Sequence, residues 1–279
     1  MSKAMWPEPW PEQARGVPNV ALRSALFGVF GKGARRYLEQ VQVATTGDAQ
    51  ILYTGQRLDQ GDLDVWEAIL HLARRQPLGV QCEFTAYQLL RLICKTDTGG
   101  NRRTLHRRIL RLKATALELS CNVQGRRVTY IGSLIHDAIQ DDRTKRYVVV
   151  INVAWRPFFE AAQFTYIDWV IRNELDGKPL AQWLHGFYST HEQPYPLTVQ
   201  FLHKLSGSDT ACMRSFRQLL KHAAAEWVSA AKTHGSQVSA SLVGDLLHVR
   251  HGLSRWRLQH PGETSTEPSL AEPALLPLA

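Results

Sequence analysis

Arginine and lysine side chains are concentrated in one part of this 279-residue chain. Between Arg91 and Arg127 there are ten Lys or Arg residues against two acidic residues, Asp97 and Glu118. The excess, ten minus two, equals the formal net charge of +8 for the whole chain. Guanidinium groups bind phosphates and guanine edges through paired hydrogen bonds. This segment therefore favours binding of a polyanion, and nucleic acid is the expected partner.

A helix is predicted from about Asn101 to Leu119, and a turn of about 100° per residue divides its side chains into two faces. One face is apolar and is expected to pack on the core: Leu105, Ile109, Leu112, Ala116 and Leu119. The opposite face holds basic side chains: Arg103, Arg107, Arg111 and, beside them, His106. The alternative is an ordinary solvated face, but such faces usually include acids for i,i+4 pairing, and none lies between Asn101 and Glu118. We therefore predict that this helix recognises DNA.

A second long helix is predicted over Asp209–Ala231, after the polar turn Ser206–Ser208. Its expected core stripe is Cys212, Phe216, Leu220, Ala223 and Trp227. Its polar side chains are expected to face away: Arg214, Arg217, Gln218 and Lys221. Taken alone, this weaker pattern fits a solvated face as well as a DNA-binding face. Its place in a second unit of matching order favours DNA binding.

Other polar side chains at helix starts and turns are expected to contact DNA, mostly at phosphates, which set register rather than sequence preference. Two of them flank the start of the first long helix, Asn101 and Arg102, and Ser208 precedes the second. The others lie at or after predicted hairpins: Arg126, Arg127, Arg143, Lys145, Arg146, Arg250, Arg255 and Arg257. Each of these arginines and lysines taken singly is equally consistent with an ordinary surface residue.

The elements around the first long helix have a recognisable order. A hairpin is predicted first, then a helix that ends at Pro77, a short strand, a helix capped by Thr85, the basic helix and a β-ribbon. The predicted ranges are Tyr37–Ala44, Gln50–Thr54, Asp59–Arg75, Val80–Phe84, Thr85–Cys94, Ser120–Gln124, Arg127–Ile135 and Tyr147–Val153. Helix, strand, helix, turn, helix and ribbon is the order of a winged helix.

A second unit repeats this order more briefly. Its predicted ranges are Phe164–Trp169, Lys178–His191, Thr198–Leu205, Asp209–Ala231, Gln237–Val243 and Leu246–His251. The predicted fold class is α+β with two tandem winged-helix domains, at residues 35–160 and 161–258. Residues 1–34 are expected to be irregular because of their prolines, with Arg23–Phe27 docking as an apolar plug, and residues 259–279 form a disordered tail.

Catalytic and metal-binding motifs were sought, and none points to an enzyme. The chain lacks a GxxxxGK[ST] phosphate loop, and Asp62-x-Asp64 is typical of a helix start rather than a nuclease site. The four cysteines form no Cys-x-x-Cys pair, so we expect reduced thiols, no metal and no cofactor. No apolar run approaches the roughly 20 residues that span a bilayer. We expect a cytoplasmic protein that is associated with DNA and not with a membrane.

Several short motifs together resemble the TrfA-type plasmid replication initiators of broad-host-range plasmids. They are RSALF (23–27), YTG (53–55), Val65-Trp66, Pro77-x-Gly79, STHEQPYPL (189–197) and GSD (207–209), in the family's order over residues 6–251. The resemblance implies two winged-helix domains that bind directly repeated origin sites (iterons), help to melt an A+T-rich segment and recruit the host helicase and host initiator protein. It also implies an active monomer and an inactive or repressing dimer formed through the first domain.

By helix position, the resemblance assigns recognition to the residues that the face analysis selects: Arg103, Arg107, Arg111, Arg214, Arg217 and Lys221. The family's longer members carry an N-terminal Gln/Leu/Phe motif that binds the sliding clamp. This chain is expected to begin too late to contain that motif, which puts the clamp contact in doubt.

Two other functions fit parts of the pattern. A winged-helix transcriptional repressor would bind a palindromic operator as a dimer, whereas an initiator monomer would occupy direct repeats. An origin-nicking enzyme would need metal-dependent strand cleavage, for which the sequence offers no residues. Iteron binding by a replication initiator is therefore the leading hypothesis, with the repressor second.

Replacing Arg255 and Arg257 together by Ala is expected to weaken binding to all DNA sequences alike, because phosphate contacts carry no sequence information. The slope of log affinity against log salt should become shallower by about 1–2, or roughly one per lost contact. Affinities for specific and scrambled duplexes across a salt series measure this effect. A selective loss of sequence discrimination would contradict it.

Overall fold

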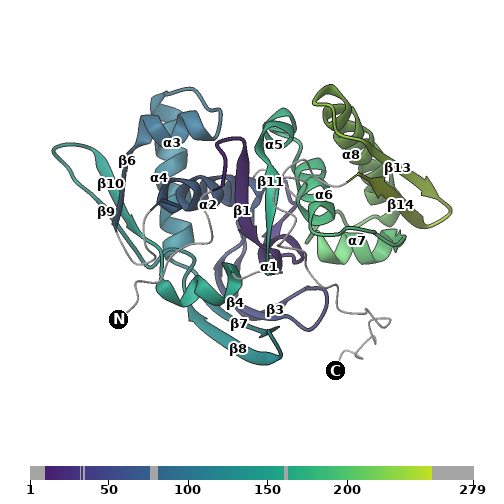
Figure 1. Ribbon diagram of the computed structural model, residues 1–279, viewed down its shortest axis with the longest axis horizontal. Helices are drawn as coiled ribbons and strands as arrows, with labels where there is room; N and C mark the ends of the chain where they lie inside the picture. The colour runs from purple at the N-terminus through teal and green to yellow at the C-terminus, as the bar shows by residue number, and fades with distance from the viewer. Residues whose placement is uncertain (1–9, 32, 34, 76–80, 160–162, 253–279) are drawn as a thin grey trace.

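The computed structural model describes residues 10–31, 33, 35–75, 81–159 and 163–252. Both helices and mostly antiparallel strands occur in this part of the chain, so the fold is of the mixed α+β kind. In Figure 1 one group of elements surrounds α4, a second group surrounds α8, and the β1–β11 pair stands between them.

The first group is built on a three-stranded sheet and three helices. The strand order is β6-β10-β9, so the strand that precedes the helix pair hydrogen-bonds to the second strand of the hairpin that follows it. The elements are α2 (Gln60–Ala73), β6 (Gln81–Thr85), α3 (Ala86–Leu92), α4 (Gly99–Lys113), β9 (Asp137–Gln140) and β10 (Arg146–Val150). Thr85 caps α3 as predicted, through a reciprocal pair of hydrogen bonds with Gln88.

The second group has the same topology, except that its hairpin follows its long helix directly, whereas another hairpin lies between α4 and β9. Its strand order is β12-β14-β13, with β12 taking the place of β6 and the β13–β14 hairpin the place of β9–β10. The elements are α6 (Pro179–Ser189), β12 (Leu197–Thr198), α7 (Val199–Leu205), α8 (Met213–Thr233), β13 (Val238–Val243) and β14 (Leu246–His251). The duplicated architecture expected from the order of the elements is therefore present.

The basic helix is shorter than predicted. α4 ends at Lys113, and Ala116 and Leu119 lie in β7 (Ala116–Val123) instead of on the helix. Leu117 and Leu119 are buried because alternate side chains of this strand face the core. In so short a stretch the same apolar residues can fit both the three-to-four-residue spacing of a helix and the two-residue spacing of a strand. The predicted helix was therefore too long.

The hairpin that carries Arg126 and Arg127 belongs to a separate sheet. β7 and β8 (Arg126–Gly132) join β3 (Tyr37–Val43) and β4 (Gln50–Gln56) in the order β3-β4-β7-β8. The ribbon attached to the α4 sheet is β9–β10, whose tip contains Lys145. Arg126 and Arg127 thus lie at a hairpin as predicted, but this hairpin is not the ribbon of the α4 sheet, as the predicted winged-helix order required.

The N-terminal segment is more ordered than predicted. β1 (Ala14–Pro18) pairs antiparallel with β11 (Phe164–Asp168), and the short helix α1 (Asn19–Leu22) follows. Pro18 ends the strand and is the N-cap of α1, so this proline marks a boundary and prevents neither element. β2 (Phe27–Gly28) pairs parallel with β5 (Leu58–Asp59), and Phe27 is buried as the expected apolar plug.

Two hydrophobic clusters hold the described residues together. The first extends from Trp10 to Trp169 and includes residues of η1 (Val153–Phe159) and β11. The second contains residues of α5 (Trp169–Glu174), α6, α7, α8 and β14, together with Val29 from the N-terminal segment. β11, which was expected to open the second unit, packs in the first cluster because it pairs with β1.

Helix α2 joins the two groups through buried acids. Its capping box, formed by Asp59 and Asp62, starts the helix as the sequence predicts. Further along, Asp64 and Glu67 both approach Nε of Arg172 from α5, at 2.8 and 3.1 Å, and Arg172 is buried. Burial raises the pKa of Glu67 to about 7 although the Arg172 guanidinium lowers it. A carboxylate at this depth depends on its cation.

Replacing Arg172 by Met should lower the free energy of unfolding by about 3–5 kcal/mol, because Glu67 would remain buried without its cation. Removing the cation raises the folded-state pKa of Glu67 further above its ordinary value of 4.5. The deficit relative to the unaltered protein should therefore grow as the pH rises from about 7, the pKa of Glu67 when Arg172 is present, and level off above the raised pKa of the variant. Urea unfolding at several pH values measures this. The double variant Arg172→Met/Glu67→Gln should recover part of the loss, and a pH-independent deficit would contradict the assignment.

Candidate nucleic-acid interface

The turn before α4 is held by side chains that fix where the helix begins. Thr98 is the N-cap, and its Oγ1 accepts from the backbone N of Asn101 at 3.2 Å. Asn101 in turn donates through Nδ2 to the carbonyl of Thr96 at 2.8 Å. Arg102 is bound by both carboxylate oxygens of Asp97, at 2.6 and 2.7 Å. Asn101 and Arg102 thus stabilise the turn before α4.

The outer face of α4 carries two exposed arginines. Arg103 and Arg107 lie one turn apart, opposite the buried Leu105 and Ile109. Neither forms an ion pair with any residue that the structure describes, and the one side-chain bond of Arg107, to Thr104 Oγ1, is long at 3.4 Å. These guanidinium groups are available to an external anion.

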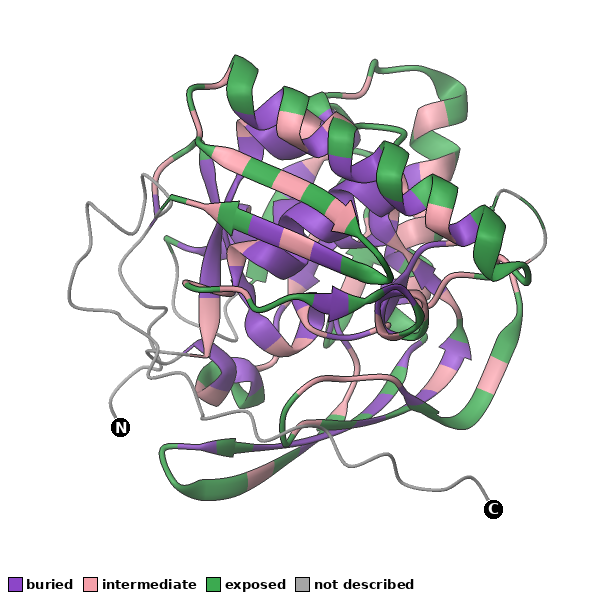
Figure 2. Ribbon diagram, turned by 90° about the vertical axis from the view of Figure 1, so that its right-hand side faces the viewer, coloured by how far each residue is buried: buried purple, intermediate pink, exposed green. Residues whose placement is uncertain are grey.

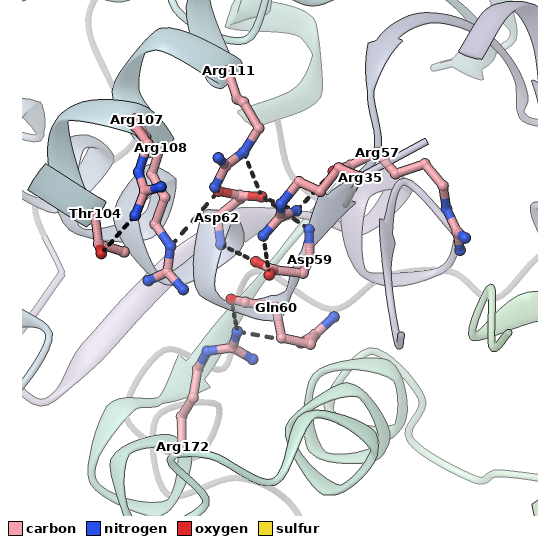
Figure 3. A network of polar contacts seen from close by, with 10 residues as sticks. All are labelled: Arg35, Arg57, Asp59, Gln60, Asp62, Thr104, Arg107, Arg108, Arg111 and Arg172. Atoms are coloured by element: carbon pink, nitrogen blue, oxygen red, sulfur yellow. Dashed lines mark hydrogen bonds and ion pairs between the residues drawn. The ribbon is translucent and has the colours of Figure 1, made fainter. Parts of the chain in front are cut away.

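Arg111 does not lie on that outer face. Its Nη2 donates to Asp62 Oδ1 at 2.6 Å and its Nε to Asp62 Oδ2 at 3.3 Å, and its side chain is only 13% exposed. Arg111 was predicted to face solvent from the periodicity of α4 alone, but α2 packs against this side of the helix. Figure 3 shows Arg111 and Arg108 directed toward Asp62 while Arg107 points to Thr104.

Asp62 accepts hydrogen bonds from Arg35 and Arg111 and forms a longer ion pair with Arg108. Arg111 and Arg108 reach it from α4, at 2.6 and 3.8 Å, and Arg35 reaches it at 3.0 Å. Its carboxylate also accepts from the backbone N of Asp59, and its side chain is fully buried. Asp62 therefore fixes the position of α4 on α2. The sequence marked it only as a helix-start residue, and its ligands, far away along the chain, gave no local signal.

Gly61 makes room for this arrangement. A Cβ at position 61 would lie 2.0 Å from Nη2 of Arg108, so any larger residue would displace that side chain from its place beside Asp62. The glycine is therefore part of the support for α4.

The β9–β10 ribbon adds exposed positive charge near the end of its turn. Thr144 N donates to the Asp141 carboxylate at 2.5 Å, and Lys145 takes a positive φ of 56° to close the turn. Lys145 and Arg146 are exposed, with only loose ion pairs to Asp142 and Glu83 at 3.8 and 3.5 Å. His106 of α4 approaches the Tyr147 hydroxyl at 3.1 Å, which ties the helix to the ribbon. The structure thus brings ribbon and helix together as one basic unit.

Helix α8 presents a similar face in the second group. Arg214, Gln218 and Lys221 are exposed, opposite the buried side chains Phe216, Leu220, Ala223 and Trp227. Figure 2 faces this side of the molecule, where exposed residues follow the outer side of the long helix above a two-stranded ribbon. Cys212 is the exposed N-cap residue of α8 and not part of the core stripe, because the helix begins four residues later than predicted.

Arg217 is directed at the second ribbon. Its Nη1 lies 3.0 Å from Asp245 Oδ1, and its Nη2 donates to the Gly244 carbonyl. Both partners lie in the β13–β14 turn, where Gly244 has a positive φ of 56°. Arg217 therefore orients the ribbon relative to α8, while Arg250 on β14 remains exposed.

Three other predicted sites have different surroundings. Ser208 donates to Thr210 Oγ1 at 3.2 Å within the turn before α8. Arg126 is exposed at the start of β8, and Arg127 donates to Gln50 Oε1 at 2.9 Å, both in the separate four-stranded sheet. Arg255 and Arg257 lie outside the described residues.

Searches for other kinds of site were limited to the described residues. In that part of the chain no group of three or more His, Cys, Asp or Glu could hold a metal ion. None of its helices has both the length and the apolar character that crossing a membrane requires. Its cysteines are free thiols, and burial raises the pKa of Cys82 and of Cys121 to about 11.

Comparison with known proteins identifies a family, a curated relative and similar solved structures. Residues 4–251 match the family model described as TrfA protein. A plasmid replication initiator protein TrfA from Escherichia coli is 30% identical over 224 residues, which are 78% of this chain and 58% of that protein. The chain thus spans little more than half the length of that relative.

Two of the similar solved structures are crystal structures of domains 2 and 3 of RctB. A selenomethionine derivative is similar with a TM-score of 0.54 and 12% identity, over 81% of this chain and 95% of that one. A second structure of the same two domains has a TM-score of 0.49 and 13% identity, over 81% and 93%. At this identity the first match concerns the fold alone.

Replacing Arg107 by Ala should weaken specific DNA binding by about 1–3 kcal/mol if the side chain reads a base edge. Its free energy of unfolding should stay within about 0.5 kcal/mol, because the side chain is exposed. Arg111→Ala is the matched control on the same helix. It should cost about 1–3 kcal/mol of stability, because Asp62 loses its closest partner. Unchanged affinity with intact folding of Arg107→Ala would remove α4 from the recognition role.

Proposed function

We propose that this chain, which belongs to the TrfA protein family, is a plasmid replication initiator that binds directly repeated origin DNA (iterons) with sequence specificity. The observation that carries the proposal is the pair of duplicated units, each with an exposed cationic helix beside a hairpin. Two such units in one chain suit a monomer that contacts two neighbouring segments of one repeat.

Each unit is proposed to be a winged helix. In the first unit β6, α3 and α4 are followed, after the inserted β7–β8 hairpin, by β9 and β10, and the pairing of β6 with β10 supports this assignment. The order β12-α7-α8-β13-β14, with β12 paired to β14, supports it for the second. In such domains the last helix enters the major groove and the hairpin lies along the backbone.

The exposed side chains are assigned to DNA by their positions. Arg103 and Arg107 on α4 would reach base edges in one major groove, and Arg214 and Lys221 on α8 in the next. Phosphate contacts would come from the ribbons, through side chains such as Lys145 and Arg250. Arg111 and Arg217 would act indirectly, since their guanidinium groups hold α4 on Asp62 and the second ribbon on α8.

The further steps of initiation follow from the family resemblance. We propose that the bound chain helps to open an adjacent A+T-rich segment and recruits the host helicase and the host initiator protein, without catalysis of its own. We also propose an active monomer in equilibrium with a dimer, in the bacterial cytoplasm on plasmid DNA. The E. coli relative is named a plasmid replication initiator, which supports this reading.

Footprinting on the origin region of the parent plasmid, repeated across a salt series, tests the proposal. Regularly spaced, directly repeated protections are expected. Each phosphate contact should add about 0.9 to the slope of log affinity against log salt, so several contacts give a steep dependence. A single protected palindrome would favour a dimeric repressor instead. Protection without sequence preference would contradict both functions.

A further inference from the structure

The segment that includes residues 25–30 runs between the two groups and contacts both. Phe27 belongs to the first hydrophobic cluster and Val29 to the second. The backbone N of Ala25 donates to the Ala44 carbonyl at 2.8 Å, and that of Val29 to the Ser206 carbonyl at 2.8 Å. Ser206 ends α7 just before the turn that leads to α8. This segment therefore reaches the turn that sets where α8 begins.

Arg57 holds the same turn from the side of the first group. Its Nη2 donates to the Gly207 carbonyl at 2.7 Å, and its Nη1 pairs with the Asp209 carboxylate. The guanidinium lies over the Phe30 ring, 4.3 Å from its centroid. Gly207 has a φ of +60°, and a Cβ there would lie 3.1 Å from that of Ala25, so the turn is tightly seated.

Arg57 is also connected to α4. Its carbonyl accepts from Arg35 Nη1 at 2.8 Å, and the same nitrogen donates to Asp62 at 3.0 Å. Asp62 binds Arg111 of α4. A continuous series of polar contacts therefore runs from α4 through Asp62, Arg35 and Arg57 to the turn before α8. Figure 3 shows the part of this series that is near α4, with the Arg57 guanidinium pointing away from Asp62.

We propose that Arg57 is a positioning residue that sets the distance between α4 and α8, and with it the spacing of the two DNA segments that the chain reads. The inference rests on the proposed function of these helices. A rigid pair of recognition elements binds best when its span matches the separation of its sites, and loses affinity when that separation changes. Arg57 is suited to this role because it bridges the groups at their edge, with its side chain 19% exposed, whereas Arg172 bridges them in the interior.

The test uses Arg57→Gln and duplexes made from one protected origin repeat. One series keeps both halves and inserts one or two base pairs between them, and another keeps only one half. We expect single-half affinities within about two-fold of the unaltered protein, because each recognition helix is intact. Affinity for the native repeat should fall about ten-fold. The ratio of the affinity for the native repeat to that for a repeat with inserted base pairs should fall by a similar factor.

Two further variants separate position from charge and from folding. Arg36→Gln removes the same charge from an exposed neighbour and should leave the spacing profile unchanged. Asp209→Asn, at a side chain that is 58% exposed, should reproduce a smaller form of the effect, because the Gly207 contact of Arg57 remains. The inference would be overturned if Arg57→Gln weakened binding to a single half as much as binding to the native repeat. It would also be overturned if the affinities of Arg57→Gln for the duplexes with inserted base pairs, relative to the native repeat, matched those of the unaltered protein.

A distance measurement without DNA gives an independent readout. Spin labels at Leu110→Cys and Leu219→Cys, both about half exposed, would report the α4–α8 separation after Cys94 and Cys212 are replaced by Ser. The Arg57→Gln variant should give a broader distribution than the otherwise identical protein. Identical distributions would overturn the inference while the proposed function stands. If the unaltered protein bound no origin repeat, the proposed function would fall and the spacing role with it.

Discussion

The buried carboxylate of Asp62 is the contact on which the arrangement of the first group depends. Arg111 and Arg108 approach it from α4, and Arg35 approaches it from just before β3. A carboxylate without exposure to water is costly unless its oxygens are paired, so the three arginines and this acid require one another. The basic helix is thereby fixed on α2 by its inner arginines, and its outer arginines remain exposed.

Helix α2 applies the same principle along its length. Asp62 near its start binds the basic helix, and Asp64 and Glu67 further on bind Arg172 from the second group. Apolar packing supplies most of the stabilisation in such a core, but it is not directional. Ion pairs with defined geometry add orientation, and here they orient both groups relative to one helix. The orientation of α4 and of α5 relative to α2 is consequently fixed in the interior of the molecule.

The duplicated groups differ in how helix and ribbon are joined. In the first, His106 of α4 meets the Tyr147 hydroxyl of β10. In the second, Arg217 of α8 binds Asp245 and the carbonyl of Gly244 in the ribbon turn. Equivalent positions are therefore held by different chemistry, which explains why the duplication is visible in the order of the elements and not in the side chains.

The amino-acid sequence by itself determined the local features. The order of the elements, the cap at Thr85, the apolar stripe of α8 from Phe216 to Trp227 and the exposed cations Arg103 and Arg107 follow from periodicity and side-chain type. Each depends on residues within a few positions of one another, where spacing along the chain is also spacing in space. The concentration of positive charge, and the nucleic-acid partner that it favours, are likewise evident from the sequence alone.

Only the tertiary structure decided which arginines are exposed and which sheet each hairpin joins. Arg111 pairs with Asp62 because α2, about 50 residues away along the chain, packs against α4. The β7–β8 hairpin pairs with β4 and not with β6, and the proline-rich N-terminal segment becomes a strand because β11 offers it a partner about 150 residues later. Such pairings depend on surfaces that exist only after the chain has folded, so no local pattern encodes them.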